Sequence, residues 1–263
     1  ICAKQVFYLN TFLISIILLF FKCFSTTGRD LRTGYYYNFQ SATSLENYRD
    51  QSIEWGFKVL TTIIRAITDN YSIFLFIVGI FTLCPVLYMV SKYRNYIDVS
   101  WYLIYYFAVF YITSFSPIRA ALAASIGMIA FEFMIRKKII CSFVFIIVAS
   151  FFHITALLLL VPFSFTYFKM FSRKMVYFIL VTLFFAVYVG RTNIGNFMLN
   201  SNRYYNYAPS DVVKIGLEQI VNYLPLFIIF FGGKKYDTNQ NIAKISIAYL
   251  STGFCVGMIG YII

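Results

Sequence analysis

One arginine stands at a predicted helix start, where its positive charge is unexpected. Arg119 follows Ser116 and Pro117, and this run is typical of a helix start because serine can cap a helix and proline suits its first turn. The N-terminus of a helix favours anions, so the helix dipole opposes an arginine there. An anion bound between Arg119 and the free N–H groups of the first turn would remove the conflict. An arginine whose side chain extends to a membrane edge would explain it equally well.

His153 is the only histidine of the chain. A neutral imidazole could accept a proton from a sugar hydroxyl, and a charged one could bind phosphate. A lone histidine is also commonly structural, and both interpretations stay open. A single histidine disfavours a zinc site, which needs three or four ligands, and the five cysteines form no CxxC pair. The sequence therefore predicts neither a bound metal nor another cofactor.

Further arginines and tyrosines lie in two long polar segments, 25–70 and 191–216. The guanidinium group is a rigid fork that fits two phosphate oxygens at once, and aromatic faces can stack on sugar rings. As a set, these residues favour an anionic ligand, with a diphosphate as the natural candidate. Ordinary loop charge and an aromatic belt at a membrane surface are the alternatives for any single residue. The predicted ligand-binding residues are Arg29, Arg32, Arg203, Tyr204 and Tyr207.

The composition excludes a compact water-soluble protein. Of the 263 residues, 60% are hydrophobic and 12% are charged, and the mean hydropathy is +0.74. A soluble domain carries about 25% charged residues. The net charge of +12 would suggest nucleic acid in a soluble protein, but here the basic residues form short clusters between apolar runs. We therefore expect a lipid bilayer, and no nucleic acid, as a partner.

Hydrophobic segments near the length of a membrane-spanning helix predict an all-α, polytopic helical bundle, formed by one membrane domain over residues 1–263. The nine expected segments are 6–24, 71–91, 99–115, 119–135, 139–152, 154–168, 175–190, 217–232 and 243–262. The short pair 139–152 and 154–168 could form a hairpin or one long helix. The chain begins without methionine and ends inside an apolar run, so we expect a fragment of a longer protein.

The lysines predict an orientation. If 139–168 is a hairpin, four basic clusters fall on one side, as the positive-inside rule expects of the cytoplasm. These clusters are Lys92/Arg94, Arg136–Lys138, Lys169–Lys174 and Lys234/Lys235. The segments 25–70 and 191–216 then form two outer loops, and Arg119 and His153 lie on that same outer side.

Segment 53–68 inside the first outer loop predicts an amphipathic helix, which could lie in the membrane interface, cover a cavity mouth or pack on neighbouring helices. The apolar stripe is Ile53, Phe57, Leu60, Ile64 and Ile67, and the polar stripe is Glu54, Lys58, Thr61, Arg65 and Thr68. We expect Glu54 to pair with Lys58 one turn away.

Glu132 is the only carboxylate well inside a predicted span, and we expect it to pair with Arg136 near the cytoplasmic end. Because no carboxylate lies at mid-membrane, an ion-coupled transporter is disfavoured.

Three motifs in order resemble the EpsG family. They are Ser116–Ala123 with the sequence SPIRAALA, the basic turn Arg136-Lys137-Lys138, and Ala149–Leu157 with the sequence ASFFHITAL. The family pairs an "IRxxLA" helix start with a basic turn and an "FHxSAL"-like segment, and it resembles Wzy-type polymerases of O-antigen, capsule and exopolysaccharide. The chain departs from a "GTD" element of the first outer loop, because Tyr35 follows Gly34.

The resemblance implies a metal-independent glycosyltransferase, a polysaccharide polymerase of the bacterial inner membrane. Such an enzyme transfers a glycan from undecaprenyl diphosphate to another lipid-linked repeat unit on the outer face. It implies catalytic roles for Arg119 and His153, diphosphate contacts from arginines such as Arg29 and Arg203, and a chain-length regulator as a partner. Two alternatives stay open: a flippase or exporter of lipid-linked oligosaccharide, and a non-catalytic membrane component of the synthesis complex.

Overall fold

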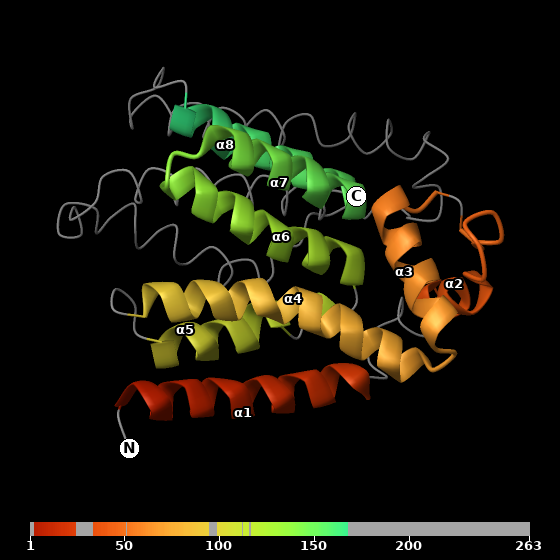
Figure 1. The fold of residues 1–263 in the computed structure, drawn as a ribbon, viewed down its shortest axis with the longest axis horizontal. Coiled ribbons are helices and arrows are strands. Elements are labelled where there is room, and N and C mark those ends of the chain that lie inside the picture. The colour runs from red at the N-terminus through yellow and green to blue at the C-terminus, as the bar shows by residue number, and fades with distance from the viewer. Residues whose placement is uncertain are drawn as a thin grey trace, which may run out of the picture. The chain divides into compact units, whose positions relative to one another are not determined.

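The computed structural model describes residues 3–24, 34–50, 52–94, 99–111, 113–115 and 117–167. Within these ranges the chain is helical and contains no strand, which confirms the all-α prediction for them (Figure 1). Helices α1 (Ala3–Cys23), α4 (Tyr71–Tyr93), α6 (Ile118–Ile135) and α7 (Ile139–Phe152) match four of the expected segments. The expected segments 175–190, 217–232 and 243–262 and the outer loop 191–216 lie outside the described residues.

Two of the described helices, α4 with 23 residues and α6 with 18, are long and apolar enough to cross a membrane. The segment 99–115 differs from a regular helix: it consists of α5 (Val99–Tyr105), a π-helical stretch over Tyr106–Tyr111 and a 3₁₀ turn over Thr113–Phe115. After α7 the chain continues as a 3₁₀ helix over Ile154–Leu159 and then α8 (Leu160–Tyr167), so 139–168 is not one continuous α-helix.

The chain divides into two compact units, one of Ile1–Glu132 with Cys141–Leu157 and one of Phe133–Ile140 with Leu158–Ile263. In the second unit, the end of α6 shows why it stops at the basic turn. Lys137 has a φ of 56°, and the Lys137 and Lys138 N–H groups donate to the Met134 and Phe133 carbonyls at 3.0 and 2.9 Å. This pair of bonds satisfies carbonyls that the helix end leaves open.

In the first unit, α4 and α6 run parallel. Phe74 and Leu122, near the two N-termini, belong to one buried apolar cluster. Midway along the helices, the Ser125 hydroxyl donates a hydrogen bond to the Thr82 carbonyl at 2.8 Å. Two parallel helices adjacent in sequence require a connection that returns along the bundle, and segment 99–115 is long enough to supply it. The parallel course of α4 and α6 therefore agrees with the expectation that an apolar segment lies between them in the chain.

Helix α1 runs antiparallel to α4. A Cβ built on Gly79 would lie 3.1 Å from Leu19, so glycine permits the close approach. Lys22, near the end of α1, is 2% exposed and donates to the Ser114 carbonyl at 2.8 Å, with its ammonium 4.5 Å from the Phe115 ring centre. The end of α1, the turn 113–115 and the starts of α4 and α6 thus lie at one end of this unit, which we call the Arg119 end.

Short helices of the first loop lie at the Arg119 end, and α3 (Trp55–Ile67) runs across the ends of the long helices, following α2 (Tyr36–Ser41) (Figure 1). The predicted apolar stripe packs inward at Phe57 and Ile64, which are 0% and 2% exposed. The stripe predicted to be polar is also largely buried: Lys58 is 9% exposed, with its ammonium 5.9 Å from the Tyr48 ring centre. Packing on neighbours therefore dominates this helix.

The opposite ends of α4 and α6 are joined by Glu132. Its side chain is 2% exposed, forms an ion pair with Lys92 and accepts a hydrogen bond from the Tyr93 hydroxyl. The sequence suggested Arg136 as a partner; the contacts with Lys92 and Tyr93 cross from α6 to α4. A buried carboxylate is stabilised best where both oxygens are satisfied, and the α4 end supplies two donors.

Removing the Glu132 charge should destabilise the bundle. In Glu132→Gln the partly buried Lys92 ammonium loses its counter-charge, so we expect a fall in the free energy of unfolding of up to about 3 kcal/mol. Thermal unfolding in detergent measures this. The matched control is Asp69→Asn, which removes an 87% exposed partner of Arg65 and should cost about 0–1 kcal/mol. Equal effects of the two substitutions would contradict the role of Glu132.

Candidate functional site

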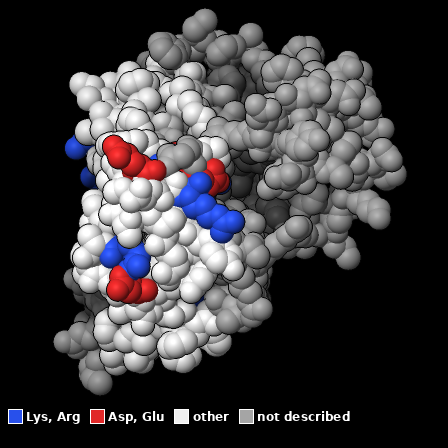
Figure 2. Space-filling model, turned by 90° about the vertical axis from the view of Figure 1, so that its right-hand side faces the viewer, with Lys and Arg blue, Asp and Glu red and all other residues white. Residues whose placement is uncertain are grey.

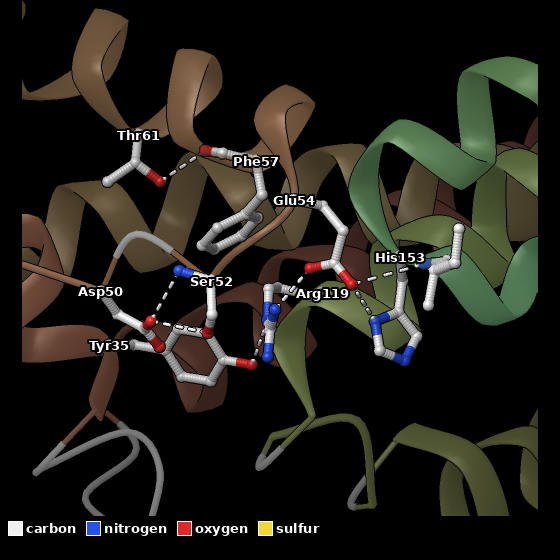
Figure 3. A network of polar contacts seen from close by, with 9 residues as sticks. Tyr35, Asp50, Ser52, Glu54, Phe57, Thr61, Arg119 and His153 are labelled. Carbon is white, nitrogen blue, oxygen red and sulfur yellow. Dashed lines mark hydrogen bonds and ion pairs between the residues drawn. The ribbon is translucent and has the colours of Figure 1, made fainter. Parts of the chain in front are cut away.

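A single carboxylate joins three separate segments at the Arg119 end. One oxygen of Glu54, Oε2, forms an ion pair with Arg119 Nη1. The other, Oε1, lies 3.2 Å from His153 Nδ1 and accepts the Ile154 N–H at 3.4 Å (Figure 3). Glu54 immediately precedes α3, Arg119 is in the first turn of α6, and His153 follows α7. The carboxylate therefore fixes the mutual positions of three chain segments far apart in sequence.

Gly56 explains how Glu54 reaches this position. A Cβ built on Gly56 would lie 2.8 Å from the Phe151 carbonyl oxygen and 2.9 Å from the Phe151 Cβ, distances that real Cβ atoms essentially never show. Only glycine lets the first turn of α3 contact the last turn of α7 so closely. Since Glu54 lies two residues before Gly56 and His153 two residues after Phe151, this contact brings the carboxylate to the imidazole.

Arg119 is held on two sides, and its Nη2 forms no hydrogen bond with the described residues. Its Nε donates to the Tyr35 hydroxyl at 3.3 Å, while Nη1 pairs with Glu54. The side chain is 24% exposed, and among the described residues no group hydrogen-bonds to Nη2. The arginine at the helix start thus has a counter-charge within the protein, the Glu54 carboxylate. The anionic ligand expected between Arg119 and the N–H groups of the first turn stays a prediction. Nη2 can still donate to a ligand.

The aromatic core beneath the network limits how far it can move. The Tyr35 ring, which receives the Arg119 contact, packs edge-on against Phe57 with ring centres 5.7 Å apart. Tyr48 is 2% exposed in the same cluster, and burial raises the pKa of its hydroxyl to about 12. Tyr48 therefore stays neutral at physiological pH and contributes no charge near Glu54.

Glu54 is ionised at all physiological pH values. Burial by itself would raise the pKa of the Glu54 carboxyl, but the hydrogen bond from His153 and the charge of Arg119 outweigh burial and hold the pKa at about 2. An ionised carboxylate can only accept hydrogen bonds, so the proton between the two groups is on His153 Nδ1. In a neutral imidazole this leaves Nε2 as a proton acceptor. Figure 3 shows the Nε2 edge turned away from Glu54.

The structure brings together the two residues expected to be catalytic, Arg119 and His153, through a residue that the sequence did not single out. The sequence paired Glu54 with Lys58, one turn away, and did not predict its contacts with Arg119 and His153, which lie far along the chain. The predicted ligand-binding residues Arg29, Arg32, Arg203, Tyr204 and Tyr207 lie outside the described residues. In the described part of the chain, no group of three or more His, Cys, Asp or Glu residues could hold a metal ion.

The model of the EpsG family matches residues 7–263, essentially the whole chain. The chain belongs to the EpsG family. This family is related to the Wzy-like polymerases, so the resemblance carried by the three motifs is confirmed and extends well beyond them. Together with the apolar helices, membership identifies an EpsG-family membrane protein linked to polysaccharide polymerisation. The searches of curated proteins and of solved structures give no match.

Gly56→Ala should uncouple Glu54 from His153 in this EpsG-family chain, because the added Cβ would push α3 away from Phe151. His153 is the only histidine, so a ¹⁵N-histidine NMR spectrum of the purified protein reports on it alone. We expect the Nδ1–H tautomer in the native chain and its loss in Gly56→Ala. Gly34→Ala is the matched control, since no atom lies within 4 Å of its added Cβ. An unchanged tautomer in Gly56→Ala would contradict the packing argument.

Glu54 should stabilise the fold in a pH-dependent way. Its pKa is about 2 in the folded chain against an ordinary value of 4.5. Because the folded value is the lower one, the contribution is present above pH 4.5 and is lost as the pH falls towards 2. The difference in melting temperature between the native chain and Glu54→Gln should therefore be largest near neutral pH and shrink below pH 4.5. A difference that is constant with pH would exclude an ionised Glu54.

Proposed function

We propose that this EpsG-family chain is a polysaccharide polymerase of the bacterial inner membrane, acting on O-antigen, capsular or exopolysaccharide repeat units. It would transfer the growing glycan from undecaprenyl diphosphate to a hydroxyl of another lipid-linked repeat unit, on the outer face. The observation that carries the proposal is the Glu54–His153–Arg119 network. It places a proton acceptor and a cation on opposite oxygens of one ionised carboxylate.

His153 is the proposed general base. The acceptor hydroxyl attacks the anomeric carbon of the donor sugar, and its proton passes to Nε2 of His153. The bond between that carbon and the diphosphate oxygen breaks, and the diphosphate keeps the electron pair. Glu54 keeps the Nδ1 proton in place and stabilises the imidazolium that forms, as a carboxylate does in a catalytic triad. Glu54 is thus a positioning residue, with no contact to substrate required.

Arg119 is the proposed contact for the leaving diphosphate. Its Nη2 is the guanidinium donor that neither Glu54 nor Tyr35 occupies. The expected role of Arg29, Arg32 and Arg203 is to add further cations, and that of Tyr204 and Tyr207 is to stack on sugar rings. The chemistry requires charge stabilisation and a base, which these side chains supply without a metal. A chain-length regulator is a possible further partner.

The charges of the apolar helices favour an enzyme over an ion-coupled transporter. Among the described residues of α1, α4, α6 and α7, Glu132 is the only carboxylate. It lies near the C-terminus of α6 and is paired with Lys92, so it is not available to carry an ion across the membrane. The reaction itself needs no gradient, because loss of the diphosphate drives it.

Purified full-length protein in detergent should extend a lipid-diphosphate-linked repeat unit into a ladder of oligomers, without nucleotide, gradient or metal. His153→Ala should slow ladder formation by about 10²–10⁴-fold, as expected for loss of a general base. Glu54→Gln should slow it while leaving the protein folded at neutral pH. Arg119→Lys keeps the charge but loses the fork, and should lose most of the polymer. Arg49→Lys, an exposed arginine outside the network, is the matched control.

Two outcomes would overturn the proposal. Normal ladders from both His153→Ala and Arg119→Lys would show that the network is structural. Native protein that forms no ladder, yet moves the lipid-linked repeat unit across a liposome bilayer, would identify a flippase. In cells, loss of the protein should remove long surface chains and retain single capped repeat units.

A further inference from the structure

Helix α3 carries an apolar stripe on its outer side. Trp55, Ile63 and Ile67 are 63%, 54% and 75% exposed, and Val59 and Ala66 lie on the same side. The members recur about every four residues, so they follow one face of the helix over its length. This stripe contains no charged residue. It differs from the apolar stripe predicted from sequence, most of which is buried against the rest of the first unit.

The stripe cannot turn inward, because the opposite side of α3 is already fixed. Phe57, Thr61 and Ile64 on that side are 0–2% exposed, and the Gly56–Phe151 contact holds the first turn. Both sides of α3 therefore need an apolar or well-packed environment. The described residues supply it on one side only. On the other side the three large apolar side chains of Trp55, Ile63 and Ile67 stay exposed, and covering them away from water would be favourable.

The position of α3 in the chain indicates what covers the stripe. The helix ends at Ile67, and α4, one of the two helices long and apolar enough to cross a membrane, begins at Tyr71. The end of α3 therefore lies where α4 enters the bilayer. The first exposed residues of α4, Ile73 and Phe76, are also apolar, at 44% and 40% exposed.

The orientation of α3 also fits a stripe that is covered by the bilayer. Figure 1 shows that α3 runs across the ends of the long helices of its unit, which is the direction of a membrane surface if those helices cross the bilayer. Figure 2, which faces this end, shows charged side chains in a few separate groups with broad uncharged areas between them. A surface bathed entirely in water carries charges more evenly.

We propose that the stripe formed by Trp55, Val59, Ile63 and Ile67 lies in the outer leaflet of the bilayer. Tryptophan is enriched at membrane interfaces, where an amphipathic ring has both an apolar and a polar environment, and isoleucine suits the acyl region below. Interfacial helices commonly bury one apolar side in the headgroup and acyl boundary. In this chain, the side of α3 away from lipid packs on protein instead of facing water.

The depth of the stripe in the membrane also sets the depth of the candidate site. Trp55 is adjacent to Glu54, so a stripe held in the interface fixes the Glu54–Arg119–His153 network near headgroup depth. The diphosphate of a lipid-linked sugar lies at that depth while its lipid stays in the membrane. This consequence rests on the proposed function; the membrane contact of α3 does not.

Tryptophan fluorescence tests the contact directly. The chain has two tryptophans, Trp55 and Trp101, so Trp101→Phe leaves Trp55 as the only reporter, and Trp55→Phe is the matched control. The 263-residue chain is reconstituted in phosphatidylcholine vesicles whose acyl chains carry bromine either near the headgroup or near the chain end. Acrylamide added to the buffer quenches tryptophans that face water. The measurement needs no substrate, so its failure is distinct from failure of the polymerase assay.

With Trp55 alone, we expect emission at a shorter wavelength than that of free tryptophan. Bromine near the headgroup should quench this emission strongly, and bromine near the chain end should quench it less. Acrylamide should quench it only weakly. Strong quenching by acrylamide with none by either lipid would show that the stripe faces water, and would overturn the proposal. Weak quenching by all three would show a cover of protein, from this chain or a second copy, and would overturn it equally.

Discussion

The Glu54 carboxylate holds together chain segments that no continuous element connects. A carboxylate accepts several hydrogen bonds at once, and this one binds a guanidinium, an imidazole and a backbone N–H. The stabilisation is mutual, because a buried carboxylate without these donors would take up a proton, and a partly buried Arg119 without the carboxylate would lack a counter-charge. The site therefore exists only when α3, α6 and α7 are packed together. Its geometry reports on the tertiary fold and not on any local motif.

The bundle makes that meeting possible through helix direction. Because α4 and α6 run parallel and α1 runs antiparallel to α4, the end of α1 and the starts of α4 and α6 share one end. The opposite end is closed by Glu132 with Lys92 and Tyr93. The carboxylates of Glu54 and Glu132 thus lie at opposite ends of the bundle and form different kinds of contact. Glu132 joins α6 to α4 through Lys92 and Tyr93. Glu54 instead leaves Arg119 Nη2 and His153 Nε2 without a hydrogen bond to the described residues.

The features that could be predicted from the sequence are those that depend on the order of residues within one segment. Long apolar runs predicted the helices, the serine and proline before Ile118 predicted where α6 begins, and the alternation of spans placed Arg119 and His153 on one side. The sequence could not predict Glu54, since the contact between Gly56 and Phe151 depends on packing between segments about a hundred residues apart. The apolar segment expected over 99–115 is helical, but its second half departs from α-helical geometry for a related reason. Buried contacts such as the hydrogen bond from Lys22 to the Ser114 carbonyl favour a π-helical and 3₁₀ path over a straight one.

Charge in the network bears on how the proposed reaction would proceed. In the form with a neutral imidazole, the positive charge of Arg119 and the negative charge of Glu54 cancel, so the network in that form has little net attraction for a diphosphate. Transfer of the acceptor proton to Nε2 makes the imidazole cationic and leaves the network with a net positive charge. That charge appears at the same moment as the negative charge on the leaving group, and an interaction that strengthens only then favours the transition state over the bound substrate. Initial binding of the diphosphate would then depend on cations beyond this network, which is the role proposed for Arg29, Arg32 and Arg203.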